Sequence, residues 1–119
     1  APPICIGAYG EQIGLPLVGR LADVWNSSLQ GDESKWIKKR DIVRASADRA
    51  GRDPSSIEIS LTIERPLPTN SEESGRYVTD LLRLKNLGVS NFVMDFGHPT
   101  STEPVMRFVD EVISKINRT

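Results

Sequence analysis

The sequence has one cysteine and one histidine among its 119 residues. Because Cys5 has no cysteine partner in the chain, an internal disulfide and a small disulfide-built fold are excluded. One cysteine and one histidine are also too few for a tetrahedral zinc site, so no metal site is expected. Cys5 lies in a short apolar segment, which predicts a small buried side chain and not a nucleophile.

Long apolar runs and an excess of charge are lacking as well. No run approaches the roughly 18 residues that span a membrane, and no signal peptide is recognisable, so a cytoplasmic location is expected. The net charge of −1 provides no general attraction to nucleic acid or to an anionic membrane. The one dense basic run, Lys38-Lys39-Arg40, falls in a helical pattern and is predicted to be a solvated face.

The composition that remains is that of an ordinary globular protein. Hydrophobic residues make up 38% and charged residues 26% of the chain, which is long enough to bury a core. The chain opens at Ala1-Pro2-Pro3 without a methionine and enters a strand almost at once. This start is typical of the interior of a larger protein, and residues 1–119 are predicted to form a single domain of it.

The hydrophobic pattern predicts four strands, each followed by a helix. The predicted strands are 4–6, 22–26, 57–63 and 91–96. The predicted helices are 13–21, 33–50, 70–87 and 105–116. Alternation of this kind indicates an α/β fold with a parallel sheet and right-handed crossovers. Four such units make either a small open sheet or one half of a (β/α)8 barrel.

Local signals mark the ends of the two longest predicted helices. Asp32 is a candidate N-cap, and Gly51 is placed to end that helix in the left-handed conformation. Asn70 followed three residues later by Glu73 resembles a capping box at the start of the next helix. Trp36 and Phe108 lie on apolar helix stripes and are predicted core residues.

The first candidate site is the glycine-rich loop Gly7-Ala8-Tyr9-Gly10, which leads from a strand towards a helix. Small residues allow a ligand to approach the backbone, and a helix N-terminus favours an anion such as a cofactor phosphate. The spacing GxxGxxxG differs from the dinucleotide fingerprint GxGxxG, and Asp23 lies at the wrong end of the next strand for it. A Rossmann site is therefore disfavoured. The alternative is that these glycines only serve a tight turn.

Two further candidates end neighbouring parallel strands. Asn26 and Ser27 close the second strand, where they either hydrogen-bond a ligand or satisfy loop backbone groups. His98 follows the fourth strand and is the only side chain whose unperturbed pKa lies near neutrality. It would act as a general acid or base only with a partner such as Asp95 within reach. The alternative for His98 is a surface residue without a catalytic role.

Three stretches together resemble one protein family. PPICIGAYGEQIGLPLVGRLADVWNSS, AGRDPSSIEIS and LGVSNFVMDF, followed by an amphipathic helix, are similar in order and spacing to the luciferase-like monooxygenases. The resemblance covers essentially the whole chain. It implies the C-terminal half of a (β/α)8 barrel, a (β/α)4 unit corresponding to roughly strands five to eight.

The resemblance also implies a function. The family uses FMN or a deazaflavin coenzyme (F-420 type) to pass hydride or electrons between cofactor and an organic substrate. Carried over, it implies that the loop after the first strand contacts the cofactor, and that the tip of the second strand lies near cofactor or substrate. The residues concerned are Gly7, Ala8, Tyr9, Gly10 and Glu11, with Asn26 and Ser27.

The sequence departs from the family in two respects. Many members have a plain glycine run where this chain has Ala8-Tyr9, so Tyr9 either folds over the cofactor ring or partly fills the phosphate site. The strands corresponding to the first half of the barrel are absent, so this chain by itself is expected to be inactive. His98 is then a polar contact near the mouth of the site.

A different class of function stays open beside this one. The chain is alternatively an inert α/β fragment or binding module that folds without catalysing a reaction. In either case a half-barrel leaves two sheet edges and an apolar inner face uncovered, which favours a homo-oligomer. Neither nucleic acid nor a membrane is an expected partner.

Overall fold

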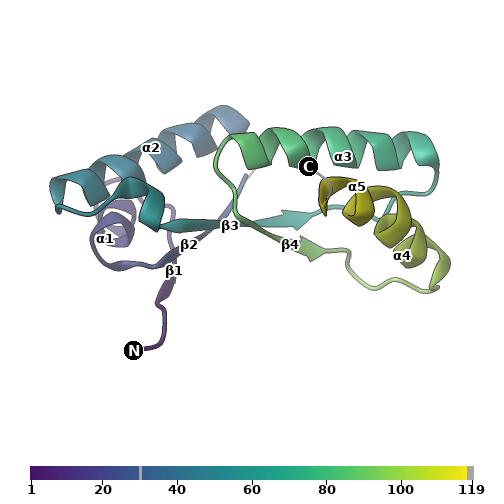
Figure 1. Cartoon of the computed structure of the whole chain (residues 1–119), viewed down its shortest axis with the longest axis horizontal. Coiled ribbons are helices and arrows are strands. Elements are labelled where there is room, and N and C mark those ends of the chain that lie inside the picture. Colours follow the sequence, from purple (N-terminus) through teal and green to yellow (C-terminus); the bar gives the residue numbers. More distant parts are fainter. Residues whose placement is uncertain (30, 118–119) are drawn as a thin grey trace. The chain divides into compact units, whose positions relative to one another are not determined.

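A computed structural model describes residues 1–29 and 31–117 of the chain, and Figure 1 shows its helices and strands. The elements, in chain order, are β1 (Cys5–Gly7), α1 (Gly14–Leu21), β2 (Val24–Ser28), α2 (Glu33–Arg49), the short 3-10 helix η1 (Pro54–Ser56), β3 (Glu58–Glu64), α3 (Ser71–Asn86), β4 (Asn91–Asp95), α4 (Glu103–Phe108), the π-helical turn η2 (Val109–Ile113) and α5 (Ser114–Asn117). The predicted alternation of strands and helices is confirmed.

The strands form one sheet in the order β1-β2-β3-β4, with β2 parallel to both of its neighbours. The α/β class with a parallel sheet is therefore confirmed. Strand β2 starts and ends two residues later than the sequence predicted. Its pairing with β1 begins at Val24 opposite Cys5, and its pairing with β3 continues to Ser28 opposite Thr62.

The chain divides into two compact units. The first contains Ala1–Ile63 and Val89–Val93, and the second contains Glu64–Gly88 and Met94–Thr119. The single-domain organisation expected for residues 1–119 stays a prediction.

In the first unit, α2 covers one face of the sheet (Figure 1). The indole rings of Trp25 on β2 and Trp36 on α2 stack with centroids 6.0 Å apart and an interplanar angle of 11°. Both rings are buried, which confirms Trp36 as a core residue. Burial of two such large aromatic surfaces is a major source of stability for this unit.

The register of the strands assigns residues to two faces. Because side chains alternate along a strand, Ile6, Trp25 and Ile59, which lie in one row, share the helix-covered face. Cys5, Val24 and Glu58 form the adjacent row on the opposite face, which we term the open face. The prediction that Cys5 is buried is wrong, because its side chain is exposed on this face.

The open face is more polar than expected. After Cys5 and Val24, its rows towards the carboxyl end contain Asn26 paired with Ser60 and Ser28 paired with Thr62. The expectation of an apolar inner face is therefore wrong for this part of the sheet. The apolar side chains of β2 and β3 that are buried lie on the other face: Trp25, Ile59 and Leu61.

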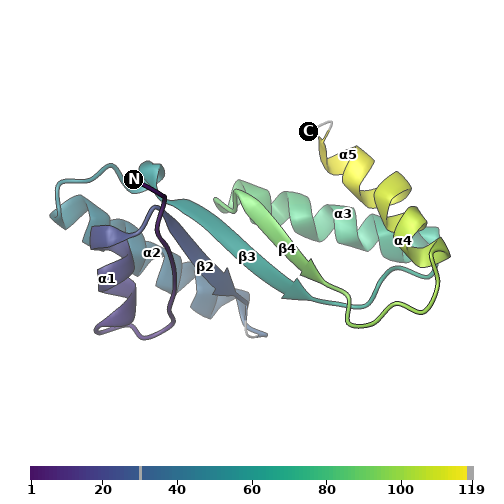
Figure 2. The same cartoon turned by 90° about the horizontal axis from the view of Figure 1, so that it is seen from below.

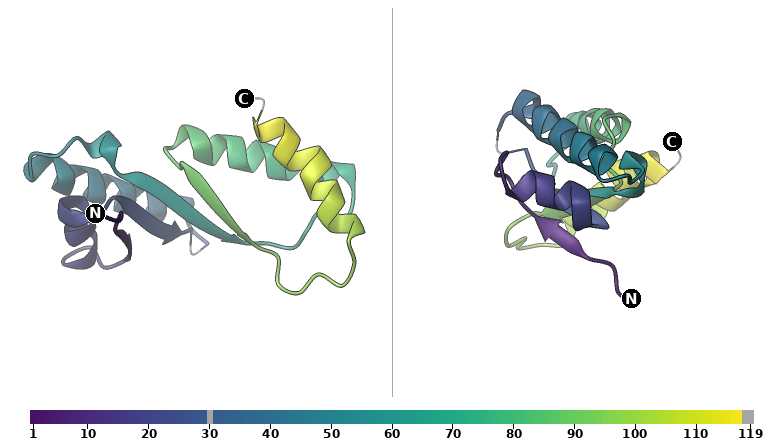
Figure 3. Two further views of the ribbon diagram at one scale, coloured as in Figure 1. Left: turned by 60° about the horizontal axis from the view of Figure 1, so that its bottom comes forward. Right: turned by 90° about the vertical axis from the view of Figure 1, so that its left-hand side faces the viewer.

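The second unit is built around α3 and the C-terminal helical segment. Figure 3 shows α4, η2 and α5 as one continuous rod, in agreement with the single amphipathic helix predicted for residues 105–116. The ring of Phe108 makes edge contacts with Tyr77 at 5.4 Å and with Phe96 at 4.9 Å between centroids. Phe108 and Val112 are buried, which confirms the core position of Phe108, whereas Val109 and Ile113 of the same predicted apolar stripe are exposed.

The predicted helix ends are confirmed in detail. The Asp32 carboxylate accepts a hydrogen bond from the N–H of Lys35 at 3.2 Å, and Gly51 has φ of +77° after the end of α2. The Asn70 side chain accepts from the N–H of Glu73 at 2.9 Å. The Glu73 carboxylate reaches back one residue further than in a standard capping box and binds the N–H of Thr69 at 2.7 Å.

Candidate functional site

The loop after β1 is held by hydrogen bonds to three consecutive carbonyl groups. The Ala8 carbonyl accepts from the indole N–H of Trp25 at 3.1 Å, and the Tyr9 carbonyl accepts from the Lys39 ammonium at 2.7 Å. The Gly10 carbonyl accepts from the N–H of Leu15 at the start of α1, at 2.8 Å. The loop is thus fixed by β2, α2 and α1 together, and its conformation is not set by its glycines alone.

Asn26 and Ser27, which were predicted as neighbours in one site, lie on opposite faces of the sheet. Asn26 is half-buried on the open face, where its side-chain oxygen accepts from the Thr62 hydroxyl at 3.4 Å. Ser27 is fully buried on the helix-covered face. Its hydroxyl donates to the Ser60 carbonyl and accepts from the indole N–H of Trp36, both at 3.0 Å. This geometry favours the structural alternative for Ser27.

Two residues that the sequence did not single out complete a polar cluster beside Asn26. Ser28 and Thr62 are paired at the carboxyl ends of β2 and β3, and the Tyr9 hydroxyl donates to the Ser28 hydroxyl at 3.3 Å. We call Gly7, Tyr9, Asn26, Ser28 and Thr62 the open-face cluster. The alternation of β2 would have placed Ser28 with Asn26 if the strand had been predicted two residues longer.

Gly7 is the small member of this cluster. It pairs with Asn26 and is exposed. A Cβ atom at Gly7 would lie 3.7 Å from the Asn26 carbonyl oxygen and 3.9 Å from its side-chain nitrogen, which are ordinary contacts. The protein's own packing therefore does not require glycine here. The absence of a side chain at Gly7 leaves the backbone open beside the Asn26 amide.

Glu11, another predicted cofactor contact, is engaged by two lysines of α2. Its carboxylate oxygens lie 3.2 Å from the Lys38 ammonium and 3.5 Å from that of Lys39. The hydrogen bond from Lys38 and the charges of both lysines lower the pKa of Glu11, and partial desolvation opposes them without cancelling the effect. The basic run is thus not uniformly solvated as predicted: the side chains of Lys39 and Arg40 are largely covered.

His98 lies in the second unit, in the loop that joins β4 to α4 (Figure 2). It is exposed, and within the described part of the chain no hydrogen bond joins it to Asp95. The Asp95 carboxylate instead accepts from the N–H of Gly97 at 2.9 Å. The catalytic role of His98 stays a prediction.

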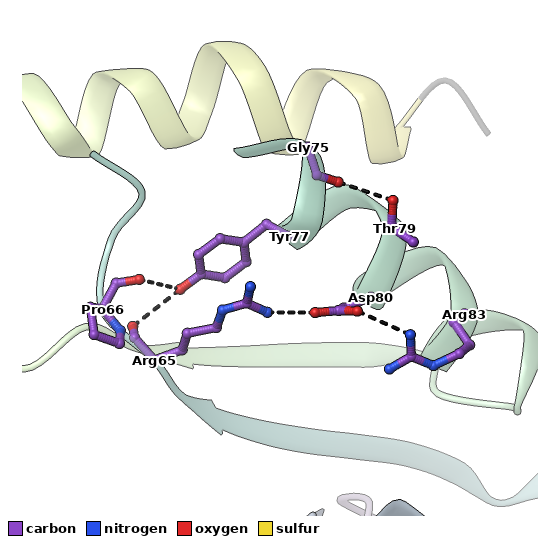
Figure 4. Close-up of polar contacts among 7 residues, drawn as sticks. All are labelled: Arg65, Pro66, Gly75, Tyr77, Thr79, Asp80 and Arg83. Carbon is purple, nitrogen blue, oxygen red and sulfur yellow. Dashed lines mark hydrogen bonds and ion pairs between the residues drawn. The ribbon is translucent and has the colours of Figure 1, made fainter. Parts of the chain in front are cut away.

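The second unit also has a shallow hollow of about 270 Å³ at the ends of β3 and β4. Its lining residues are Glu64, Arg65, Pro66, Asp95, Phe96 and Gly97. Figure 4 shows that the guanidinium of Arg65 binds Asp80, at 2.9 Å, and Arg65 also lies 4.0 Å from the centroid of the Tyr77 ring. The Arg65 guanidinium thus forms an ion pair with α3 through Asp80. The acidic residues that line the hollow are Glu64 and Asp95.

Solved structures share this parallel sheet and its helices. The chain superimposes on a coenzyme F420-dependent tetrahydromethanopterin reductase from Methanopyrus kandleri with a TM-score of 0.69 and 13% identity. The match covers 96% of this chain and 51% of the reductase, so the chain spans about half of that enzyme's length.

A second similar structure is a riboflavin lyase with modified FMN and riboflavin bound. Its TM-score is 0.53 and its identity 18%, over 70% of this chain and 18% of the lyase. No protein-family model matches the sequence, and no curated protein matches it either. At these identities the likeness shows a shared fold.

Membrane-spanning helices and metal-binding clusters are both lacking in the described part of the chain. None of the described helices is long and apolar enough to cross a membrane. In residues 1–29 and 31–117, no group of three or more His, Cys, Asp or Glu side chains is placed to hold a metal ion.

The open-face cluster has a defined chemical character. Its hydroxyl and amide groups both donate and accept hydrogen bonds, and it contains no carboxylate, lysine or histidine. Such a surface can bind and orient a neutral polar ring.

Proposed function

We propose that the first unit forms one wall of the cofactor site of a flavin- or deazaflavin-dependent oxidoreductase of the luciferase-like type. The observation that carries this proposal is the open-face cluster, which lies at the carboxyl ends of β1, β2 and β3, where α/β proteins place their ligands. The sequence resemblance and the fold shared with a coenzyme F420-dependent reductase support it.

In this proposal the residues of the chain bind and orient the cofactor. Asn26 has an amide nitrogen beside Gly7, and Ser28 and Tyr9 add hydroxyl groups, which suits the alternating donors and acceptors of a flavin or deazaflavin ring. The cofactor supplies hydride or electron transfer to and from an organic substrate. Gly7, Ala8, Tyr9 and Gly10 form the contact surface of the loop, and a catalytic role for His98 stays a prediction.

The proposal extends to the whole enzyme. The chain matches about half of the reductase, so we propose that the chain is the C-terminal (β/α)4 half of a barrel and is inactive without the other half. We further propose that the chain by itself self-associates, since β1 and β4 end the sheet with unpaired edges.

Cofactor titration tests the proposed site. FMN and the deazaflavin coenzyme are added separately to the protein, and the cofactor's own fluorescence is followed. We expect saturable binding of one of them, weakened about tenfold in Asn26→Ala, because a hydrogen bond to a buried polar group is worth roughly 1–2 kcal/mol. Gly10→Asp, which adds a carboxylate to the loop, should also weaken binding.

Asn91→Ala is the matched control. Asn91 begins β4 and its side chain donates to Glu58 at 3.4 Å, at the amino end of the strands and away from the open-face cluster. Its removal should leave cofactor binding unchanged. Indifference of the wild-type protein to both cofactors would favour the inert binding module, and binding of NAD(P) instead would favour a nucleotide site of the Rossmann kind.

A further inference from the structure

Lys38 and Lys39 are neighbours in the sequence but differ in what they hold. Lys38 is 69% exposed and pairs with the Glu11 carboxylate at 3.2 Å. Lys39 is 17% exposed and donates to the Tyr9 carbonyl at 2.7 Å, with Glu11 at 3.5 Å. An exposed ion pair contributes little, whereas a short charge-assisted hydrogen bond from a covered ammonium fixes its acceptor.

The acceptor of Lys39 is the central residue of the loop. Tyr9 is bound at both ends, since its carbonyl accepts from Lys39 and its hydroxyl donates to Ser28 in the open-face cluster. The position of the Tyr9 side chain across the end of β2 therefore depends on a lysine of α2, thirty residues away in the sequence.

The remaining loop carbonyls show why this tether matters. Trp25 binds the Ala8 carbonyl and Leu15 binds the Gly10 carbonyl, whereas the donor to the Tyr9 carbonyl between them is Lys39. Without it the Tyr9 carbonyl would lose its protein donor among the described residues, and the peptide group between Tyr9 and Gly10 would be freer to rotate. Glycine at position 10 adds to that freedom.

We propose that Lys39 is a positioning residue that preorganises the loop after β1 for the cofactor, and that Glu11 does not contact the cofactor. This inference rests on the proposed function of the same site. A loop that is already ordered binds with less loss of entropy, so the tether increases affinity without touching the ligand.

The test compares Lys39→Met with Lys38→Met, which removes the same charge from the adjacent, preceding residue. Amide hydrogen exchange of residues 8–13 is measured in the unliganded protein, and FMN and deazaflavin binding are measured by fluorescence. Lys39→Met should increase the amide exchange rates of the loop and weaken cofactor binding, each by about tenfold. The loop would open more often in the unliganded protein, and its ordering on binding would cost more entropy. Lys38→Met should change either quantity less than about twofold, as an exposed pair does.

Lys39→Arg provides the rescue, since it keeps a donor and a charge and should restore most of the loop protection and affinity. Glu11→Gln should leave affinity within about threefold of the wild type, because a loop held by Lys39 needs no charge at position 11. Equal loop exchange rates and equal cofactor affinities in Lys39→Met and Lys38→Met would overturn the proposal. A loss of cofactor affinity in Glu11→Gln as large as that in Lys39→Met would overturn it as well. If the wild type binds neither cofactor, the proposed function fails, and the exchange comparison alone then decides whether Lys39 orders the loop.

Discussion

Gly19 marks the closest approach of α1 to α2. A Cβ atom at this position would lie 2.6 Å from both the Ser46 side chain and the Val43 carbonyl oxygen, and 2.8 Å from the backbone nitrogen of Ala47. Two of these atoms belong to the backbone of α2, so they cannot move aside as a flexible side chain would. A single missing methyl group thus sets the distance between the two helices that cover the first unit.

We expect Gly19→Ala to lower the free energy of unfolding by about 1–3 kcal/mol, because the added methyl group forces the helices apart. Urea unfolding followed by tryptophan fluorescence measures this, since Trp25 and Trp36 stack in the same unit. Gly75→Ala is the matched control. Gly75 lies in α3, and a Cβ atom there would meet nothing within 4 Å beyond its neighbours in the chain and the backbone of its own helix, so alanine should stabilise by about 0.5–1 kcal/mol. An unchanged free energy of unfolding in Gly19→Ala would contradict the close packing of α1 against α2.

At the scale of elements, Tyr77 ties α3 to the segment that leaves β3. Its hydroxyl donates to the carbonyls of Arg65 at 3.1 Å and Pro66 at 2.6 Å (Figure 4). Burial raises the pKa of Tyr77, although the nearby Arg65 charge opposes this. Burial also acts to raise the pKa of Asp80, but hydrogen bonds from Arg65 and Arg83 outweigh it and the pKa of Asp80 is lowered.

Tyr77→Phe should lower the free energy of unfolding by about 1–3 kcal/mol near pH 7, since two covered carbonyl groups lose their donor. The raised pKa adds a pH dependence. The stability that comes from protonated Tyr77 is fully present below the unfolded tyrosine pKa of about 10, and it is lost as pH rises through the higher folded pKa. The variant should therefore lack this component of the alkaline decline, which urea unfolding at pH 7, 9 and 10.5 would show.

Tyr9→Phe controls for the loss of a tyrosine hydroxyl. Tyr9 is exposed and its single hydroxyl contact to Ser28 is 3.3 Å long. We expect the free energy of unfolding to change by less than about 0.5 kcal/mol, as is usual for surface substitutions. Equal effects of the two substitutions would argue against a structural role for the Tyr77 hydroxyl.

For the whole molecule, the end strands of the sheet decide how the chain behaves alone. β1 has a partner strand only in β2, and Ile4 beside it is 51% exposed. Unpaired strand edges with apolar side chains favour pairing with another chain. We expect sedimentation at micromolar concentration to show a dimer or a larger species.

Ile4→Lys would place a charge at this edge and should shift the sedimentation towards the monomer. The substitution changes only an exposed side chain, because the backbone N–H of Ile4 binds the Asp23 carboxylate at 2.7 Å whatever the side chain is. A wild-type protein that sediments as a monomer and binds no apolar dye would show that self-association was a wrong expectation.

The sequence by itself determined the class of the fold and the ends of its helices. Asp32, Gly51 and Asn70 act on backbone groups only a few residues away, so their roles follow from local geometry that a sequence pattern records. The alternation of strands and helices likewise required a parallel sheet. Asn26 and the loop that follows β1 were recognisable as candidate ligand-binding residues, because each lies where a predicted strand ends.

Only the tertiary structure decided which face each strand residue occupies. Ser27 and Ser28 are chemically the same, yet one is buried under Trp36 and the other joins Tyr9 in the open-face cluster. Cys5 is exposed for the same reason, since burial depends on which segment packs over a strand. Lys39 is the clearest case: its charge was visible in the sequence, but the Tyr9 carbonyl that it binds is brought to it only when α2 packs behind β1 and β2.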